Sequence, residues 1–422
     1  MQYRPTRREY LLSLGVTGAA GLAGCNTTET GTPTGTEAST DAGTATPART
    51  EPPTEPEPTE TPSEDPEPDP PEASIGGWPM FGADPANTRS APEETGPTEN
   101  VGTLWQFRAS NVISTSPAVV DDTVYVGSHD RNVYAIDAAG GTEQWRFATD
   151  GAVQSSPAVL DGTVYVGSND GHVYAVDAAD GTEQWRFATD GAVQSSPAVL
   201  DGTVYVGSDD THVYAIDAAD GTERWRFRTR GRVQASPAVA DGTVYAGSLD
   251  QRAYAIDAAD GSQRWEFGTG RYIFNAPTVA NGVVYVSATN RTEGTMYALE
   301  AGDGAERWRY QSFTPRGPTV AVADGTAYLG TTHEDIFALD AATAGERWRY
   351  RPGDWLMAEL SVVDGTVYAG CGDGVVRAVD ASDGTERWTV DTGNLIRTPP
   401  TVVDGVVYVG NYSDTVYAIS EA

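Results

Sequence analysis

Residues 145–184, WRFATDGAVQSSPAVLDGTVYVGSNDGHVYAVDAADGTEQ, are repeated almost unchanged as residues 185–224. The two copies differ at four positions only, which are Asn169/Asp209, Gly171/Thr211, Val176/Ile216 and Gln184/Arg224. The same period is marked along the chain by tryptophans at spacings of 40, with one spacing of 43: Trp105, Trp145, Trp185, Trp225, Trp265, Trp308, Trp348 and Trp388. A fixed period of this length is typical of propellers and solenoids, so the repeat decides the architecture.

One repeat contains four runs that have the composition of strands. The runs are residues 156–160, 163–168, 172–177 and 183–187. They are separated by turn signals, of which Asp161-Gly162 is the signature of a two-residue hairpin. Four antiparallel strands in 40 residues predict one propeller blade for each repeat.

The number of repeats predicts eight blades. Eight sets of three inner strands are present, and their third strands carry Tyr134, Tyr174, Tyr214, Tyr254, Tyr297, Phe337, Arg377 and Tyr417. The last set ends at Ser420 without a fourth strand, whereas a spare strand around Trp105, residues 103–107, precedes the first set. We therefore predict an all-β, eight-bladed β-propeller in which residues 103–107 pair with residues 416–419 and close the ring. Closure removes the exposed edges of an open array.

The charge of the chain excludes two classes of partner. Sixty Asp and Glu oppose 27 basic residues, all of them Arg, which gives a net charge of −33. Such acidity does not fit a protein that binds nucleic acid or anionic lipid through their phosphate groups. An acidic surface with Arg in place of Lys indicates a halophilic protein, because concentrated salt screens the self-repulsion.

The N-terminal part of the chain predicts export and anchoring. Arg7-Arg8 resembles a twin-arginine signal, the apolar stretch to Ala23 is too short to span a bilayer comfortably, and residues 22–25 resemble a lipobox ending at Cys25. We expect residues 1–25 to be a twin-arginine lipoprotein signal with Cys25 as the lipidation site. The protein would then lie on the outer face of the cytoplasmic membrane. Residues 26–74, rich in Thr, Pro and Glu, predict a disordered stalk, and residues 75–422 the propeller.

The pattern Ala175-x-Asp177-x-x-x-Gly181-x-x-x-Trp185 is similar to the tryptophan-docking motif of the pyrroloquinoline quinone (PQQ)-like β-propellers. It recurs at most repeats, and it is altered before Trp308 and Trp348. The resemblance implies that all eight repeat tryptophans are structural docking residues, each packed between neighbouring blades. Residues 78–84, with Asn87 and Thr88, also resemble the arm that precedes the first blade in this family.

The resemblance leaves the function open. The family includes quinoprotein dehydrogenases, which hold PQQ and calcium, and non-catalytic scaffolds such as the propeller lipoprotein of the β-barrel assembly machinery. Those dehydrogenases have adjacent cysteines, whereas Cys371 stands alone between two glycines, and Cys25 is the second cysteine of the chain. We therefore predict no cofactor, no metal and no catalytic residue, with PQQ and calcium as the alternative.

The loops between blades indicate where a partner would bind. The first blades carry near-identical loops, with Gln154, Gln194 and Gln234 at one equivalent position, whereas the later loops carry aromatic residues and arginines. Such side chains are typical of recognition surfaces, although they could instead pack into the central funnel. The candidate partner-binding residues are Arg271, Tyr272, Phe274, Asn275, Arg316, Trp355, Glu359 and Arg397.

These observations predict a monomeric binding or assembly scaffold whose partner is a protein or an extracellular polymer. The first alternative is a PQQ-dependent dehydrogenase. The second is a carbohydrate binder, which would require Tyr272 and Trp355 to be exposed and roughly coplanar.

Overall fold

A computed structural model describes residues 77–290, 292–312, 319–331, 335–351 and 356–422. Every regular element in these ranges is a β-strand. Within them, no helix has the length and apolar character that crossing a bilayer requires. The predicted signal and stalk lie outside the described residues.

The strands form eight four-stranded antiparallel sheets. The first four sheets are β2 (Ala118–Val120), β3 (Thr123–Gly127), β4 (Asn132–Asp137) and β5 (Glu143–Ala148); β6 (Ala158–Leu160), β7 (Thr163–Gly167), β8 (His172–Asp177) and β9 (Glu183–Ala188); β10 (Ala198–Leu200), β11 (Thr203–Gly207), β12 (His212–Asp217) and β13 (Glu223–Arg228); and β14 (Ala238–Ala240), β15 (Thr243–Gly247), β16 (Arg252–Asp257) and β17 (Gln263–Gly268). The last four are β18 (Thr278–Ala280), β19 (Val283–Thr289), β20 (Gly294–Glu300) and β21 (Glu306–Ser312); β22 (Thr319–Ala323), β23 (Thr326–Gly330), β24 (Ile336–Asp340) and β25 (Glu346–Tyr350); β26 (Leu356–Val363), β27 (Thr366–Cys371), β28 (Val375–Asp380) and β29 (Glu386–Asp391); and β30 (Thr401–Val403), β31 (Val406–Gly410), β32 (Thr415–Glu421) and β1 (Val101–Arg108).

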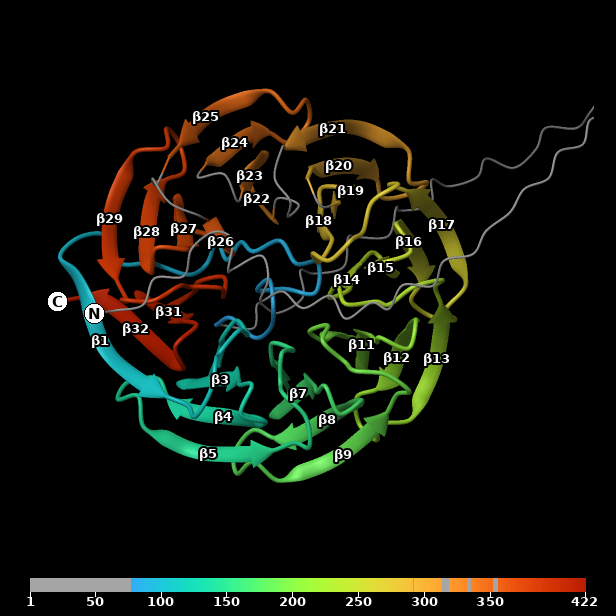
Figure 1. Ribbon diagram of the computed structural model, residues 1–422, viewed down its shortest axis with the longest axis horizontal. Coiled ribbons are helices and arrows are strands. Elements are labelled where there is room, and N and C mark those ends of the chain that lie inside the picture. Colours follow the sequence, from blue (N-terminus) through green and yellow to red (C-terminus); the bar gives the residue numbers. More distant parts are fainter. Residues whose placement is uncertain (1–76, 291, 313–318, 332–334, 352–355) are drawn as a thin grey trace, which may run out of the picture. The chain divides into compact units, whose positions relative to one another are not determined.

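The sheets are the eight blades of a propeller, and Figure 1 shows them following one another around a ring with their first strands innermost. The prediction of ring closure is confirmed. Strand β1 pairs with β32 in the eighth blade, with Thr103 opposite Ile419 and Phe107 opposite Val416. The start of the domain therefore supplies the outermost strand of its last blade.

The antiparallel order assigns the connections to two faces. Because consecutive strands reverse direction, the loops between second and third strands lie on the same face as the inter-blade loops, which join each outermost strand to the next innermost one. We call this the upper face. The tight turns between first and second strands, and between third and fourth strands, lie on the opposite, lower face.

The repeat tryptophans connect each blade to the next. The indole N–H of Trp145, on β5, donates a hydrogen bond of 2.9 Å to the carbonyl oxygen of Ala178 in the following blade. Equivalent bonds of 2.7 to 3.0 Å are made by Trp105, Trp185, Trp225, Trp265, Trp308 and Trp348. The rings are 8–9% exposed, so a buried indole joins the sheets at each contact.

The eighth tryptophan uses a different acceptor. The outermost strand of the last blade is β1, so no turn joins it to the strand before it, β32. Trp388, on β29, instead donates to the carbonyl oxygen of Pro97, 2.7 Å away, just before β1. The docking role predicted for the tryptophans therefore extends to the blade that closes the ring.

The segment before β1, residues 77–95, crosses the middle of the ring, where Figure 1 shows it in blue. We call it the arm. Its backbone carbonyls or amides bond to six innermost strands, at Val119, Val159, Val239, Val279, Val322 and Val362. Asn87 and Arg89 are 2% and 1% exposed, and the Asn87 side-chain amide donates to the carbonyls of Pro237 and Pro277. The arm therefore fills the centre of the ring with hydrogen-bonded chain.

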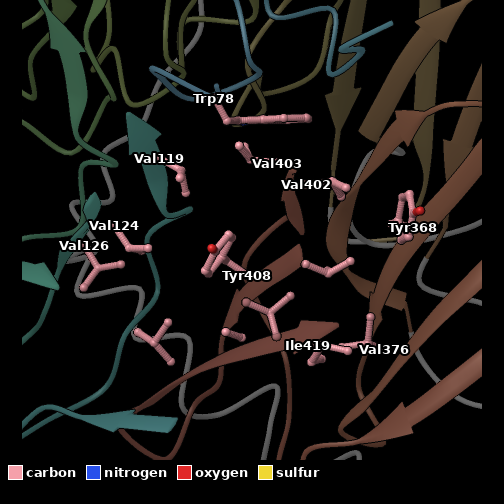
Figure 2. Close-up of a cluster of buried hydrophobic side chains, with 14 of the residues drawn as sticks. Trp78, Val119, Val124, Val126, Tyr368, Val376, Val402, Val403, Tyr408 and Ile419 are labelled. Carbon is pink, nitrogen blue, oxygen red and sulfur yellow. The ribbon is translucent and has the colours of Figure 1, made fainter. Parts of the chain in front are cut away.

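The arm also joins the core at the closure point. Trp78, 1% exposed, belongs to one apolar cluster with residues of the first and last blades. Figure 2 shows its ring beside Val119, Val402 and Val403, with Tyr408 below. The arm and β1 thus bury apolar surface at the junction where the ring closes.

Two glycines of one blade separate the effect of the tryptophan contact from that of backbone strain. A Cβ on Gly181 (φ 76°) would lie 2.8 Å from the Trp145 ring, whereas a Cβ on Gly162 (φ 72°) meets nothing within 4 Å. Both alanine substitutions strain the backbone, but only Gly181→Ala displaces the indole. We expect Gly181→Ala to lower the free energy of unfolding by about 1–3 kcal/mol more than Gly162→Ala. Guanidinium denaturation of both variants measures this difference, and equal midpoints would contradict the tryptophan contact.

Candidate functional site

The inter-blade loops of the upper face share one buried anchor. Val153, for example, is fully buried, and its Cγ1 occupies the space where a Cβ on Gly127 would lie. The fully buried residues at this position are Ile113, Val153, Val193, Val233, Ile273 and Ile396. The residues on either side of the anchor can therefore vary while the loop keeps its place.

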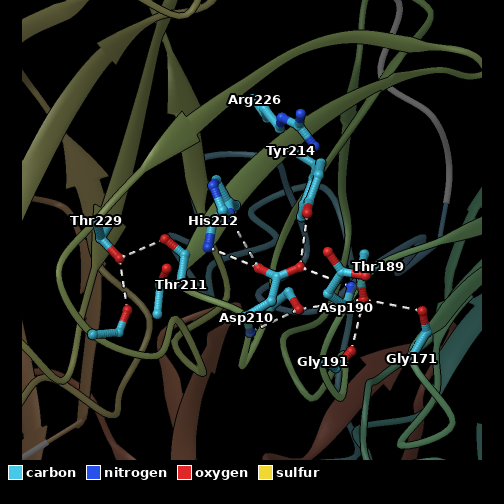
Figure 3. A network of polar contacts seen from close by, with 12 residues as sticks. Gly171, Thr189, Asp190, Gly191, Asp210, Thr211, His212, Tyr214, Arg226 and Thr229 are labelled. Carbon is cyan, nitrogen blue, oxygen red and sulfur yellow. Dashed lines mark hydrogen bonds and ion pairs between the residues drawn. The ribbon is translucent and has the colours of Figure 1, made fainter.

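A repeated aspartate fixes each of the loops that lead into the first four blades. In Figure 3, Asp210 accepts hydrogen bonds from the Tyr214 hydroxyl (2.7 Å), the His212 backbone amide (2.9 Å) and the Asp190 backbone amide (3.0 Å). Its carboxylate also lies 3.2 Å from the His212 ring nitrogen Nδ1. Asp130, Asp170 and Asp250 accept equivalent bonds from a tyrosine hydroxyl and from a loop amide. The loop that carries Tyr272 and Phe274 is held differently, by two backbone hydrogen bonds between Tyr272 and Thr289 of 2.8 and 2.9 Å.

The hydrogen bonds determine the ionisation of this aspartate. Burial alone would raise the pKa of Asp210, but the bonds from Tyr214, His212 and the Asp190 amide outweigh burial and lower the pKa below its usual value. The carboxylate is therefore ionised at neutral pH and acts as a permanent acceptor.

Exposed apolar side chains gather on the upper face. Among the described residues the exposed large hydrophobic side chains are Leu104, Tyr272, Phe274 and Tyr412, at 51%, 46%, 47% and 37%. Three of the four lie on upper-face loops, and Leu104 lies on β1. The Tyr272 and Phe274 rings pack edge to face, with centroids 6.1 Å apart and planes at 60°. We call them the aromatic pair.

A second cluster surrounds Arg397, in the loop that leads into the eighth blade. Its guanidinium lies over the Tyr412 ring, 4.6 Å from the centroid. Nearby, the Ser114 hydroxyl oxygen is 2.8 Å from Nε2 of His129. Burial, followed by the positive charge of Arg397, lowers the pKa of His129, so its ring is neutral at pH 7.

The structure separates the predicted partner-binding residues by role. Tyr272 and Phe274 are exposed together, and Arg397 is half-buried over Tyr412. Arg271 instead pairs with Glu293 at 2.5 Å and donates to Thr295, so it braces its own loop against the hairpin of β19 and β20. The side chain of Asn275 is half-buried.

Three of the predicted partner-binding residues, and the predicted lipidation site, cannot be placed in this way. Arg316 and Trp355 lie outside the described residues, as does Cys25. Glu359 belongs to β26, but its side chain is not described.

Two exposed features were missed by the sequence analysis. Tyr412 stands where the equivalent residues are Asn169 and Asp209, and Arg228, Arg230 and Arg232 lie exposed on the loop that leads into the fourth blade. Aligning all eight repeats residue by residue would have found both, because the arginines replace alanine and aspartate of the preceding copy and Tyr412 occupies a position that differs from copy to copy.

Comparison with known proteins supports the fold from two sides. Residues 113–316 match the family model described as the β-propeller of the β-alanine-activating enzyme. Residues 292–422 match the model described as the outer membrane protein assembly factor BamB. No curated protein matches the sequence. Part of the chain thus matches the family model of a PQQ-like propeller, and the resemblance seen in the tryptophan motif is confirmed.

Solved structures of different function share this fold. BamB from Moraxella catarrhalis superposes with a TM-score of 0.64 and 18% identity, covering 76% of this chain and 97% of BamB. The quinohemoprotein alcohol dehydrogenase from Comamonas testosteroni superposes with a TM-score of 0.69 and 17% identity, and the match covers 83% of this chain and 81% of the dehydrogenase. A europium-containing methanol dehydrogenase superposes with a TM-score of 0.71 and 15% identity, and the match covers 83% of this chain and 99% of that enzyme. At these identities the likeness shows the fold alone.

The described residues show no carboxylate cluster that would hold calcium beside PQQ. Calcium takes six to eight oxygen ligands, usually with several carboxylates. Nowhere in the described ranges do three His, Cys, Asp or Glu side chains come together as a metal site. Cys371 is fully buried in an apolar cluster with Leu360 and Val367. We therefore derive no chemistry through the quinone.

The lowered pKa of Asp210 gives a test of the loop support. The ionised carboxylate stabilises the fold above the unfolded-state pKa, about 3.9, and this contribution is lost as the pH falls through the lower folded-state value. We expect Asp210→Asn to be less stable at neutral pH and to lose stability less steeply than the parent below about pH 4. Denaturation midpoints across this range measure both effects. Asp241→Asn, in an exposed hairpin turn, changes the net charge equally, and identical pH slopes in the two variants would contradict the role of Asp210.

Proposed function

We propose that this protein is exported by the twin-arginine route, anchored to the outer face of the cytoplasmic membrane through Cys25, and acts there as a non-catalytic binding or assembly scaffold. The upper face is its working surface. The observation that carries the proposal is the gathering of exposed aromatic side chains on the loops of that face. Grouped exposed apolar residues typically mark interaction sites.

The structure of these loops favours a role of the aromatic side chains in binding a partner over a role in packing the central funnel. The loop of the aromatic pair is fixed by the buried anchor Ile273 and by two backbone hydrogen bonds between Tyr272 and Thr289, so an exposed side chain beside the anchor is not needed to fold the blade. Tyr272 and Phe274 flank the fully buried Ile273 and remain nearly half exposed. A rigid loop that presents aromatic residues loses little conformational entropy on binding a partner.

The two alternatives receive less support. For a dehydrogenase, no observation on the described residues offers positive support, because no three His, Cys, Asp or Glu side chains among them come together as a metal site. For a carbohydrate binder, the rings of the aromatic pair meet at 60° and do not offer one flat platform. BamB, a structural match, is described by its family model as an assembly factor, and a scaffold role agrees with that description.

Photo-crosslinking tests the working face. A photoreactive phenylalanine analogue at position 274 or 412 should form a discrete adduct in intact cells, identified by mass spectrometry of the cross-linked peptide. Leu104 is the matched control, because it is equally exposed but lies on the outermost strand β1. Equal labelling at all three positions, or labelling at 104 alone, would refute the proposal.

Anchoring has its own test. Cys25→Ser removes the only thiol in the lipobox-like sequence, so the full-length variant should leave the detergent phase and appear in the soluble fraction. Phase partition followed by immunoblotting measures this shift. Cys371→Ser, a change in the propeller core, is the control and should remain in the detergent phase. Retention of both variants in the detergent phase would show that Cys25 is not the anchor.

A further inference from the structure

The near-identical repeats contain one concentrated charge change. Residues 148–152 and 188–192 both read Ala-Thr-Asp-Gly-Ala, whereas the equivalent residues 228–232 read Arg-Thr-Arg-Gly-Arg. Three arginines thus replace two alanines and one aspartate, a gain of four positive charges in a chain whose net charge is −33. The change begins at Arg228, the last residue of β13, and continues into the upper-face loop between β13 and β14.

These arginines are not needed to shape their loop. The Thr229 hydroxyl donates to the carbonyls of Gly231 (2.6 Å) and Thr211 (2.9 Å), as the Thr189 hydroxyl does to Gly191 and Gly171 in the preceding loop. The Arg230 backbone amide donates to Asp250, as the Asp190 amide does to Asp210. The two loops therefore use the same bonds with different side chains at positions that are exposed.

The arginine loop lies beside the aromatic pair. The turn between β15 and β16 bonds to both loops, because the Leu249 amide donates to the Arg232 carbonyl (2.9 Å) and the Ser248 carbonyl accepts from the Ile273 amide (3.4 Å). Ile273 is the buried residue between Tyr272 and Phe274. Arg232 is 61% exposed along its side chain and lies 3.5 Å from Asp209. We call Arg228, Arg230, Arg232, Tyr272 and Phe274 the arginine–aromatic patch.

We infer that the arginine–aromatic patch binds an acidic polypeptide segment that also carries apolar side chains. Guanidinium groups pair with carboxylates through two parallel hydrogen bonds, and adjacent aromatic rings accept an apolar anchor. The edge-to-face arrangement of Tyr272 and Phe274 suits separate side chains better than the flat face of a sugar ring. The inference rests on the proposed function and names the chemistry of the partner.

The first experiment measures binding of defined peptides to the full-length protein by fluorescence anisotropy. The probe is a labelled synthetic peptide of alternating Glu and Phe, and its reference is the same peptide with Gln for every Glu. We expect the acidic peptide alone to bind. The triple variant Arg228→Ala, Arg230→Asp and Arg232→Ala, which restores the sequence of the preceding loop, should weaken binding by about tenfold or more. Equal affinity for the two peptides, or an unchanged affinity in the variant, would overturn the inference.

A second variant distinguishes binding at the arginine–aromatic patch from non-specific attraction of the acidic peptide to arginines. Adding Ala188→Arg, Asp190→Arg and Ala192→Arg to the triple variant returns the net charge to that of the parent, but places the arginines one blade farther from the aromatic pair than in the parent. The patch predicts that binding stays weak. Recovery of parental affinity would show adsorption to arginines alone and would overturn the inference. Circular dichroism of both variants checks that the strand content is retained.

The outcomes also separate this inference from the proposed function. If position 274 cross-links in cells while the acidic peptide does not bind, the face is correct and the acidic partner is wrong. If cross-linking and peptide binding both fail, the working face itself is wrong. Binding that is lost on Tyr272→Ser with Phe274→Ser, as well as in the arginine variant, supports both.

Discussion

The bond on which the structure depends runs from an indole N–H to a main-chain carbonyl of the next blade. A single blade cannot bury both faces of its sheet, so each blade is stable only against its neighbours. The tryptophan fills that interface, and its polar edge fixes the distance between sheets. Closing the ring extends the same contact to the last interface, where Pro97 supplies the acceptor and β1 supplies the strand. The arm must then cross the centre of the ring to reach β1.

This ring of docked blades explains why some side chains can serve recognition while others serve folding. Buried anchors such as Val233 and Ile273, with aspartates such as Asp250, hold the upper loops in place. The residues beside Val233 can change from Ala and Asp to Arg without altering the backbone bonds of the loop. Duplication of the blade therefore supplies a rigid support, and divergence at exposed positions supplies the recognition surface.

The repeat period predicted the fold down to the pairing of residues 103–107 with residues 416–419, because strand number and closure follow from periodicity. The candidate site was predictable only in part. Sequence composition cannot reveal that Arg271 is held by Glu293, since that ion pair forms between separate segments of the blade. Sequence composition also did not identify Tyr412 as a candidate, because its exposure depends on the path of two neighbouring loops. Conversely, Tyr272 and Phe274 were predicted from the sequence as candidate partner-binding residues, and both side chains are exposed.

The central claim is that the upper face is the surface at which this protein works. Hydrogen–deuterium exchange of the protein in native membranes, compared with the purified full-length protein, tests it most directly. The account predicts added protection in peptides that cover residues 228–234, 270–275 and 394–398, with the lower-face turns unchanged. Protection confined to the lower-face turns, or no difference between the two samples, would contradict it.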